Sequence, residues 1–326
     1  MSEHHVIYLS QADVAGAGLS MEEMIRSLET MFRFKGEGRT EMPPKPGIHP
    51  QKDAFIHAMP AYIPDMNAAG VKWVAGYPDN YKKGLPYITG LMIMNDTETG
   101  LPLVIMDCAW ITAMRTGAAT AVAAKHLARP DSATLGILGC GVQGESNLEA
   151  LAVVQRQLKT VVVYDVFAEK AELYAEKMKR RFPALDFIRA ASPREAVAGS
   201  DMIVTAGPIR KDPEPVIEAA WFREGTFVST VDFDSYWKPA AMRLSDRFCT
   251  DDRDQMAYYK REGYFRHIPE VTSDLGEIAA GRSSGREHER ERIMTMNLGL
   301  ALEDMAVGKI VCERAKQLGL GVRLPL

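Results

Sequence analysis

Three cationic side chains lie in sequence contexts that suit the binding of an anion. Lys45 stands among prolines, Lys72 lies inside the apolar run 71–75, and Arg115 immediately precedes a Thr-Gly pair. A lysine in the middle of an apolar strand is costly to bury unless an anion accompanies it. The alternative is that Lys72 extends its ammonium group to solvent. From these residues alone both interpretations stay open.

A glycine motif at residues 139–144, GCGVQG, fits the G-x-G-x-x-G pattern of dinucleotide-binding loops. It follows a predicted strand and opens a predicted helix, which is the context that makes the pattern informative. The first glycine permits a tight turn, the second lets the backbone approach a pyrophosphate, and the third lets the helix pack on the strand. The N-terminus of the helix also favours phosphate. The loop residues expected to contact the cofactor are Gly139, Gly141, Val142, Gln143 and Gly144.

Asp165 indicates which dinucleotide is bound. It follows the next predicted strand, 21 residues after Gly144, close to the spacing of the carboxylate that binds a ribose. Such a carboxylate accepts hydrogen bonds from both ribose hydroxyls and repels a 2′-phosphate. Residues 166–168 contain no arginine that could hold that phosphate. We therefore expect NAD(H) rather than NADP(H); the alternative is that Asp165 only caps the next helix.

The elements that must position these residues follow two different patterns. After residues 129–131 (Arg-Pro-Asp), predicted strands alternate with predicted helices, which implies a parallel sheet with right-handed crossovers. The strands are expected at 134–138, 160–164, 187–189, 202–205, 227–231 and 247–250, and the helices at 144–155, 169–181 and 193–198.

Residues 52–106 contain short apolar runs separated by Gly, Pro and Asn, which predict an antiparallel sheet. Helices are predicted at 21–34, with Ser20 and Glu23 forming a capping box, at 110–127, and as one long helix at 293–318. The expected domains are 1–128, 129–295 (the NAD-binding Rossmann domain) and 296–326, a C-terminal helix returning to the first domain.

The composition is that of an ordinary globular protein. The chain has 326 residues and a formal net charge of −4, without the basic surplus that nucleic-acid binders usually show. No apolar run approaches the length of a membrane span, and the N-terminus lacks the pattern of a signal peptide. The four cysteines form no CxxC pair and the histidines show no ligand spacing. We expect buried free thiols, no metal, no membrane or nucleic-acid partner, and a cytoplasmic location.

Four further motifs together resemble the ornithine cyclodeaminase/mu-crystallin family. They are residues 96–102 (DTETGLP), 106–107 (MD), 111–120 (ITAMRTGAAT) and 299–304 (GLALED). The resemblance covers nearly the whole chain and implies a dinucleotide-binding domain inserted into an α+β substrate-binding and dimerisation domain. It also implies a homodimer whose interface is an extended sheet or barrel.

The activity implied by this resemblance is NAD-dependent hydride transfer at the Cα–N bond of an L-amino acid, through an imine. Ornithine cyclodeaminase-like chemistry, an amino-acid dehydrogenase and a ketimine or imine reductase all fit, because they use the same residues. The non-enzymatic alternative is a mu-crystallin-like small-molecule binding protein.

The resemblance also carries residue roles onto this sequence. Lys72 and Arg115 match the cations that hold the substrate carboxylate, and Lys45 falls where many members have arginine. Thr116 and Thr120 match the segment that lies against the nicotinamide and phosphates. The same reading gives Lys72 a catalytic role and places Thr205, at the end of a predicted strand, among the cofactor contacts.

The predicted base is Asp234, with Asp232 the second candidate, from aligning Lys238 with the lysine of the family pattern G-x-D-x-P-G-K. The chain departs from the family in two places. Tyr236 and Trp237 replace Pro-Gly, and His57, counted with the substrate-binding residues, stands where ornithine cyclodeaminases carry glutamate. The histidine puts ornithine cyclisation in doubt and leaves the substrate side chain open; Tyr77, Tyr236 and Trp237 could line the pocket or belong to the core.

Overall fold

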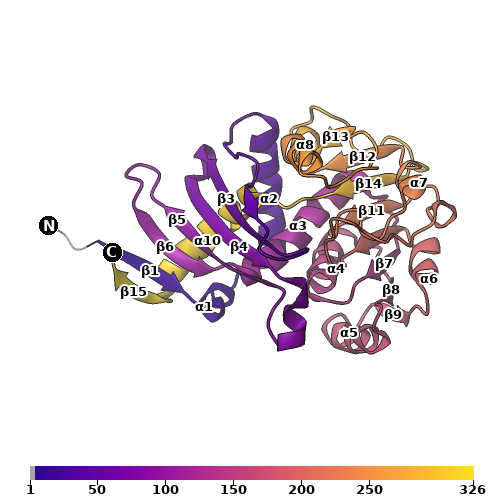
Figure 1. Cartoon of the computed structure of the whole chain (residues 1–326), viewed down its shortest axis with the longest axis horizontal. Helices are drawn as coiled ribbons and strands as arrows, with labels where there is room; N and C mark the ends of the chain where they lie inside the picture. Colours follow the sequence, from indigo (N-terminus) through magenta and orange to yellow (C-terminus); the bar gives the residue numbers. More distant parts are fainter. Residues whose placement is uncertain (1–3) are drawn as a thin grey trace. The chain divides into compact units, whose positions relative to one another are not determined.

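The computed structural model describes residues 4–326, which divide by their internal packing into two units: the chain up to Arg115 together with Gly299–Leu326, and Thr116–Leu298 (Figure 1). The first division falls inside a helix, earlier than the limit of 128 expected from the sequence. The reason lies in the packing of that helix after Arg115. A Cβ on Gly117 would lie 2.4 Å from the carbonyl oxygen of Ser146, so this part of the helix is in close contact with the second unit.

The first unit is a mixed sheet with helices on one face. Its strands run in the order β15-β1-β6-β5-β4-β3-β2, with β1 and β6 parallel and the other neighbours antiparallel. Helix α10 packs across β3, β4 and β5, and α2 packs against α10 (Figure 1). The bounds are β1 (His5–Leu9), α1 (Gln11–Gly16), α2 (Met21–Gly36), β2 (Gly47–Ile48), β3 (Phe55–Ile63), η1 (Pro64–Met66), β4 (Ala68–Gly76), η2 (Pro78–Lys83), β5 (Ile88–Asn95), β6 (Pro102–Asp107), α10 (Ala301–Leu318) and β15 (Val322–Pro325).

The antiparallel strands predicted for residues 52–106 are confirmed, as is the capping box at the start of α2. The Ser20 hydroxyl accepts the backbone N–H of Glu23, and the Glu23 carboxylate accepts the backbone N–H of Ser20. Each strand then alternates between a face covered by α10 and an open face, since successive side chains point to opposite sides of a sheet.

The second unit is a parallel sheet with helices packed around it, as the alternating pattern predicted. Its strands run in the order β13-β12-β14-β11-β10-β7-β8-β9. The order reverses between β7 and β10, and ligands of open α/β sheets bind beyond the carboxyl ends of the strands at such a point. The bounds are β7 (Thr134–Leu138), α4 (Val142–Val154), β8 (Thr160–Tyr164), α5 (Ala168–Arg181), β9 (Asp186–Arg189), α6 (Pro193–Ala198), β10 (Met202–Thr205), η3 (Ala219–Trp221), β11 (Phe227–Thr230), α7 (Pro239–Met242), β12 (Arg247–Thr250), α8 (Arg253–Arg261), β13 (Ser273–Asp274), α9 (Leu275–Ala279) and β14 (Ile293–Met296). Helix α3 (Ala109–Leu127) crosses the division between the units.

The single helix predicted over 293–318 is wrong in its first part. Ile293–Met296 forms β14, inserted between β11 and β12, and α10 begins only at Ala301. A strand of a parallel sheet that is buried on both faces shows no alternation, so its short apolar run cannot be told from a helical turn by periodicity.

Within the described residues 4–326, no helix combines the length and the apolar character needed to cross a membrane.

Candidate functional site

Lys72 is buried in the first unit and has an anionic partner. On the helix-covered face of the sheet it pairs with Met59 on β3 and Met92 on β5, and its relative exposure is 0%. Its Nζ lies 2.6 Å from Oδ2 of Asp304, in the first turn of α10, and donates to Oγ1 of Thr112 at 3.4 Å. Burial lowers the pKa of Lys72, while the Asp304 carboxylate acts in the opposite direction. The alternative of a solvent-reaching lysine is therefore wrong.

Arg115 and Lys45 meet the start of the same helix. The Nη1 of Arg115 donates to Oε2 of Glu303 at 2.7 Å, and its Nε lies 3.3 Å from Asp304. Lys45 Nζ donates to the carbonyl oxygen of Gly299 at 3.0 Å. Gly299 has φ +77°, and a Cβ there would lie 2.5 Å from the Arg115 guanidinium. A glycine before α10 thus leaves room for the Arg115 guanidinium beside the acidic first turn of the helix.

We call Lys45, Lys72 and Arg115 the cation cluster. Each of the three side chains is at most 8% exposed. Lys72 and Arg115 contact the carboxylates of Asp304 and Glu303, and Lys45 contacts the carbonyl oxygen of Gly299, so the three cations gather at the start of α10. A carboxylate bound beside these cations would form charge-assisted hydrogen bonds with them.

His57 borders this cluster. It lies on β3 two residues before Met59, on the same face, and its ring stacks on Phe55 with centroids 4.3 Å apart. Burial lowers the pKa of His57 to about 3, and the charge of Lys45 acts in the same direction. The imidazole is therefore neutral at physiological pH and adds no charge.

The glycine loop of the second unit has room for a ligand. Gly139 has φ +104°, and a Cβ on it would lie 2.5 Å from the carbonyl oxygen of Ala206; a Cβ on Gly144 would lie 2.4 Å from the carbonyl oxygen of Gly139. The protein itself therefore requires these two glycines. Gly141, the N-cap of α4, meets nothing within 4 Å. Open space at the second glycine, with the first N–H groups of α4 beside it, fits the approach of a pyrophosphate.

Asp165 connects the end of β8 to this loop. Its Oδ2 accepts the backbone N–H of Cys140 at 2.9 Å and its Oδ1 accepts that of Phe167 at 3.0 Å. The N-cap of α5 is Phe167, with no side-chain cap hydrogen bond, so Asp165 is not simply a helix cap. Each carboxylate oxygen keeps a further lone pair, which suits hydrogen bonds from ribose hydroxyls.

Two threonines predicted to contact the cofactor are buried in the second unit. Thr120 is 1% exposed and its hydroxyl lies 2.9 Å from the Ser229 hydroxyl. Thr205 is 0% exposed and donates to Oδ1 of Asp232 at 2.6 Å. Each hydroxyl therefore has a partner inside the protein, and a contact of these two residues with the cofactor stays a prediction. Thr116 follows Arg115 on α3.

The two candidate bases differ in burial. Asp232 is 0% exposed, with its oxygens bonded to the Thr205 hydroxyl and, at 3.0 Å, to the backbone N–H of Gly207. Burial raises the pKa of Asp232 to about 7. Asp234 is partly exposed, and burial raises its pKa as well, opposed by the charge of His267. Only Asp234 presents a carboxylate that an incoming molecule could reach.

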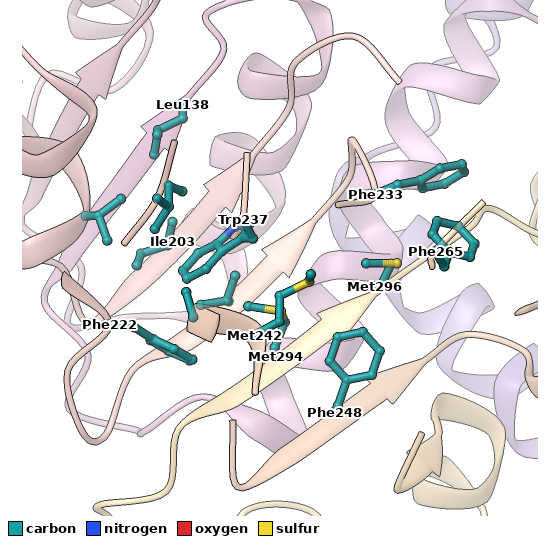
Figure 2. Packing of buried hydrophobic residues seen from close by; sticks show 14 of the residues in the cluster. Leu138, Ile203, Phe222, Phe233, Trp237, Met242, Phe248, Phe265, Met294 and Met296 are labelled. Carbon is teal, nitrogen blue, oxygen red and sulfur yellow. The ribbon is translucent and has the colours of Figure 1, made fainter. Parts of the chain in front are cut away.

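The aromatic residues of this segment separate into core and edge. Trp237 is 0% exposed, and its ring packs edge-to-face on Phe222 at 5.2 Å (Figure 2). Trp237 therefore belongs to the core. Tyr236 is only partly buried, and a Cβ on Gly207 would lie 2.6 Å from its ring. Tyr77, in the first unit, is partly buried at the start of η2.

Sequence reasoning did not assign the acids of the cation cluster. Glu303 and Asp304 were noted only as part of a motif, yet both are 0% exposed and bind Arg115. Two adjacent acids in the apolar start of a helix are the signal that could have identified them, because buried carboxylates need cations. Across residues 4–326, no group of three or more His, Cys, Asp or Glu side chains is arranged to hold a metal ion.

Comparisons with known proteins identify the family of the chain. The model of the ornithine cyclodeaminase/mu-crystallin family matches residues 5–319. The nodulation efficiency protein NfeD of Rhizobium meliloti is 35% identical over 318 residues, covering 97% of each chain.

Two solved structures are similar over their whole length. The Δ1-pyrroline-2-carboxylate reductase of Thermococcus litoralis, in complex with NADH and L-proline, has a TM-score of 0.88 at 34% identity and covers 98% of this chain and 100% of its own. An archaeal alanine dehydrogenase dimer with bound NAD has a TM-score of 0.87 at 32% identity, covering 99% and 100%. At these sequence identities the similarity extends beyond the shared fold.

Proposed function

The chain belongs to the ornithine cyclodeaminase/mu-crystallin family, and we propose that it is an NAD(H)-dependent oxidoreductase acting at the Cα–N bond of an amino or imino acid. The proposed substrate has one carboxylate and a neutral side chain. The observation that carries this proposal is the cation cluster, which gathers three buried cations at the start of α10 and suits a carboxylate ligand. The neutral His57 beside it supplies no anion for a side-chain ammonium group.

The proposed roles follow from the contacts. Lys72 and Arg115, held in place by Asp304 and Glu303, orient the substrate carboxylate, with Lys45 as a third cation. The glycine loop and Asp165 hold NAD(H), which supplies a hydride acceptor or donor for the substrate Cα when bound. Asp234 accepts a proton from the substrate nitrogen in the oxidative direction and returns it in the reductive direction.

The relatives favour a dehydrogenase or an imine reductase. The two solved structures are a Δ1-pyrroline-2-carboxylate reductase and an alanine dehydrogenase, and both of those reactions use substrates without a charged side chain. A cyclodeaminase needs a side-chain amine that attacks the imine, so it stays the alternative.

The free, buried cysteines support the expected cytoplasmic setting.

The test is a pair of substrates that differ mainly in side-chain charge. NADH absorbance is followed with NAD+ and L-norvaline or L-ornithine, with ammonia release measured in parallel, and then with NADH and a cyclic imino acid. We expect the amount of NADH formed or consumed to equal the amount of substrate converted. We also expect norvaline to have a higher kcat/KM than ornithine. Ammonia from ornithine without net NADH would establish cyclodeamination instead. NADH binding without turnover of any substrate would favour a binding protein.

A homodimer is proposed from the open face of the first sheet. On this face Trp73 pairs with Ala58 and Leu91 across β3 and β5, and Trp73 and Leu91 are 51% and 42% exposed. The next row joins Ile93 to Val71. Exposed apolar patches of this kind mark interaction sites, and the archaeal alanine dehydrogenase is described as a dimer.

Trp73→Glu tests this interface. We expect light scattering after gel filtration to show a dimer for the wild type and a monomer for the variant, because the charge would be buried without a partner. A matched change on the exposed surface of α5, Leu173→Glu, leaves a dimer. A dimeric Trp73→Glu variant, or a monomeric wild type, would contradict the proposed interface.

A further inference from the structure

One buried carboxyl group joins two neighbouring strand ends at the carboxyl edge of the parallel sheet. Asp232 follows β11, and its two oxygens accept hydrogen bonds from the Thr205 hydroxyl at 2.6 Å and from the Gly207 backbone N–H at 3.0 Å. The backbone N–H of Val231 also donates to the carbonyl oxygen of Thr205. The segment 205–207, which begins with the last residue of β10, is therefore tied to the end of β11 at three points.

The segment 205–207 is the neighbour of the glycine loop. The backbone N–H of Ala206 donates to the carbonyl oxygen of Leu138, at the end of β7, and the carbonyl oxygen of Ala206 occupies the space that a Cβ on Gly139 would need. Gly207 is confined between the ring of Tyr236 and the carboxyl group of Asp232. A shift of Gly207 would also move Ala206, whose carbonyl oxygen packs against Gly139 of the glycine loop.

Asp232 also begins the turn that carries Asp234. Phe233, between the two aspartates, has φ +64°, a left-handed conformation that a bulky side chain rarely adopts without support. Its buried ring packs edge-to-face on Phe265 at 5.0 Å and on Tyr259 at 5.9 Å, and Figure 2 shows it beside Phe265. Asp232 on one side and this aromatic contact on the other hold the strained turn.

We propose that Asp232 is a positioning residue: its two hydrogen bonds fix the segment 205–207 beside the dinucleotide loop and hold the turn that carries Asp234. The proposal rests on the proposed function for the roles of the loop and of Asp234. The ionisable groups near Asp232 are Asp234 and the Tyr236 phenol. The neutral and the anionic carboxyl can both keep the two bonds, because a protonated oxygen can donate to the Thr205 hydroxyl.

The experiment compares Asp232→Asn with Asp232→Ala by titration with NADH, followed by fluorescence. Asparagine can accept from the Gly207 N–H and donate to the Thr205 hydroxyl, so we expect its dissociation constant to stay within about threefold of the wild type. Alanine leaves the Gly207 N–H unpartnered and the segment unsupported, so we expect affinity to fall by about tenfold or more. Asparagine thus acts as the conservative rescue that distinguishes positioning from bulk stability.

Two further variants complete the test. Thr205→Val removes one bond without creating a void, and we expect it to weaken NADH binding by at least about threefold even if the alanine variant fails to fold. Asp201→Asn is the matched control, because Asp201 accepts the N–H groups of Ala133 and Thr134 at the opposite edge of the same sheet. It should lower the melting temperature without changing NADH affinity.

The outcomes separate this proposal from the proposed function. Alanine or valine variants that bind NADH like the wild type would overturn the positioning role, and so would an asparagine variant as weak as alanine, since the charge rather than the bonds would then matter. A wild-type protein that fails to bind NADH would instead refute the proposed function, and the positioning role with it.

Discussion

Asp304→Asn removes the charge that accompanies the buried Lys72. The two side chains are 0% and 1% exposed, and the Nζ–Oδ2 distance is 2.6 Å. Asparagine keeps the size and one acceptor oxygen, so the variant changes the electrostatics with little change in packing. The variant removes one negative charge that faces both Lys72 and Arg115. We expect the first unit to lose most of its stability margin.

The magnitude follows from the burial of the pair. Removing one partner of a buried ion pair costs about 3–5 kcal/mol of unfolding free energy, and for a unit of about 140 residues this lowers the melting temperature by about 10–17 °C. The control is Glu313→Gln on the same helix, which breaks the partly exposed pair with Lys309. Because that pair is an i,i+4 contact at the surface, we expect a loss of about 0.3–0.5 kcal/mol.

The contribution of Lys72 to the free energy of unfolding changes with pH in a defined direction. Burial lowers the pKa of Lys72 in the folded chain below its ordinary value of 10.5, so the folded chain binds fewer protons than the unfolded chain between these two pKa values. Stability contributed by this group therefore rises with pH through that interval. Loss of Asp304 removes an influence that raises the pKa, so the interval widens and the defect of Asp304→Asn should shrink towards alkaline pH.

The assay is urea unfolding of wild type, Asp304→Asn, Lys72→Met and the double variant, followed by circular dichroism at neutral and alkaline pH. Methionine fits the apolar row formed by Met59 and Met92, so the double variant should be more stable than the sum of the single losses implies. The reasoning is refuted if Asp304→Asn costs less than about 1 kcal/mol at neutral pH, or if its defect grows with pH.

Four other substitutions test the sites separately. Asp234→Asn should lower kcat by about 10²–10⁴-fold while NADH still binds, because only the proton acceptor is removed; wild-type turnover would exclude Asp234 as the base. Gly141→Ala should keep the melting temperature but weaken NADH binding, since its Cβ meets only open space, whereas Gly144→Ala should also destabilise the fold because its Cβ meets backbone; unchanged NADH affinity for Gly141→Ala would mean that no phosphate approaches there. Gly299→Ala, at φ +77° and against the Arg115 guanidinium, should raise the substrate KM more than it lowers kcat, measured by steady-state kinetics.

Local patterns predicted most of the elements because their causes are local. The capping box of Ser20 and Glu23 depends on residues three apart, and the glycine loop depends on six consecutive residues between a strand and a helix. One element contradicts its local pattern: the apolar run 293–296 is typical of a helix but forms β14. Whether such a run becomes a strand depends on β11 and β12 on either side of it, and these are distant in the sequence.

The sequence by itself determined that Lys72 needed an anion if buried, and that either Asp232 or Asp234 could be a base. The tertiary structure decided the first point, and for the second it shows only how the burial of the two aspartates differs. The face of β4 on which Lys72 lies is covered by α10, which brings Asp304 to it from the other end of the chain. The end of β10 meets Asp232 and uses both of its oxygens, leaving Asp234 accessible. Ion pairs and burial are set by which elements pack together, and that is a property of the folded chain.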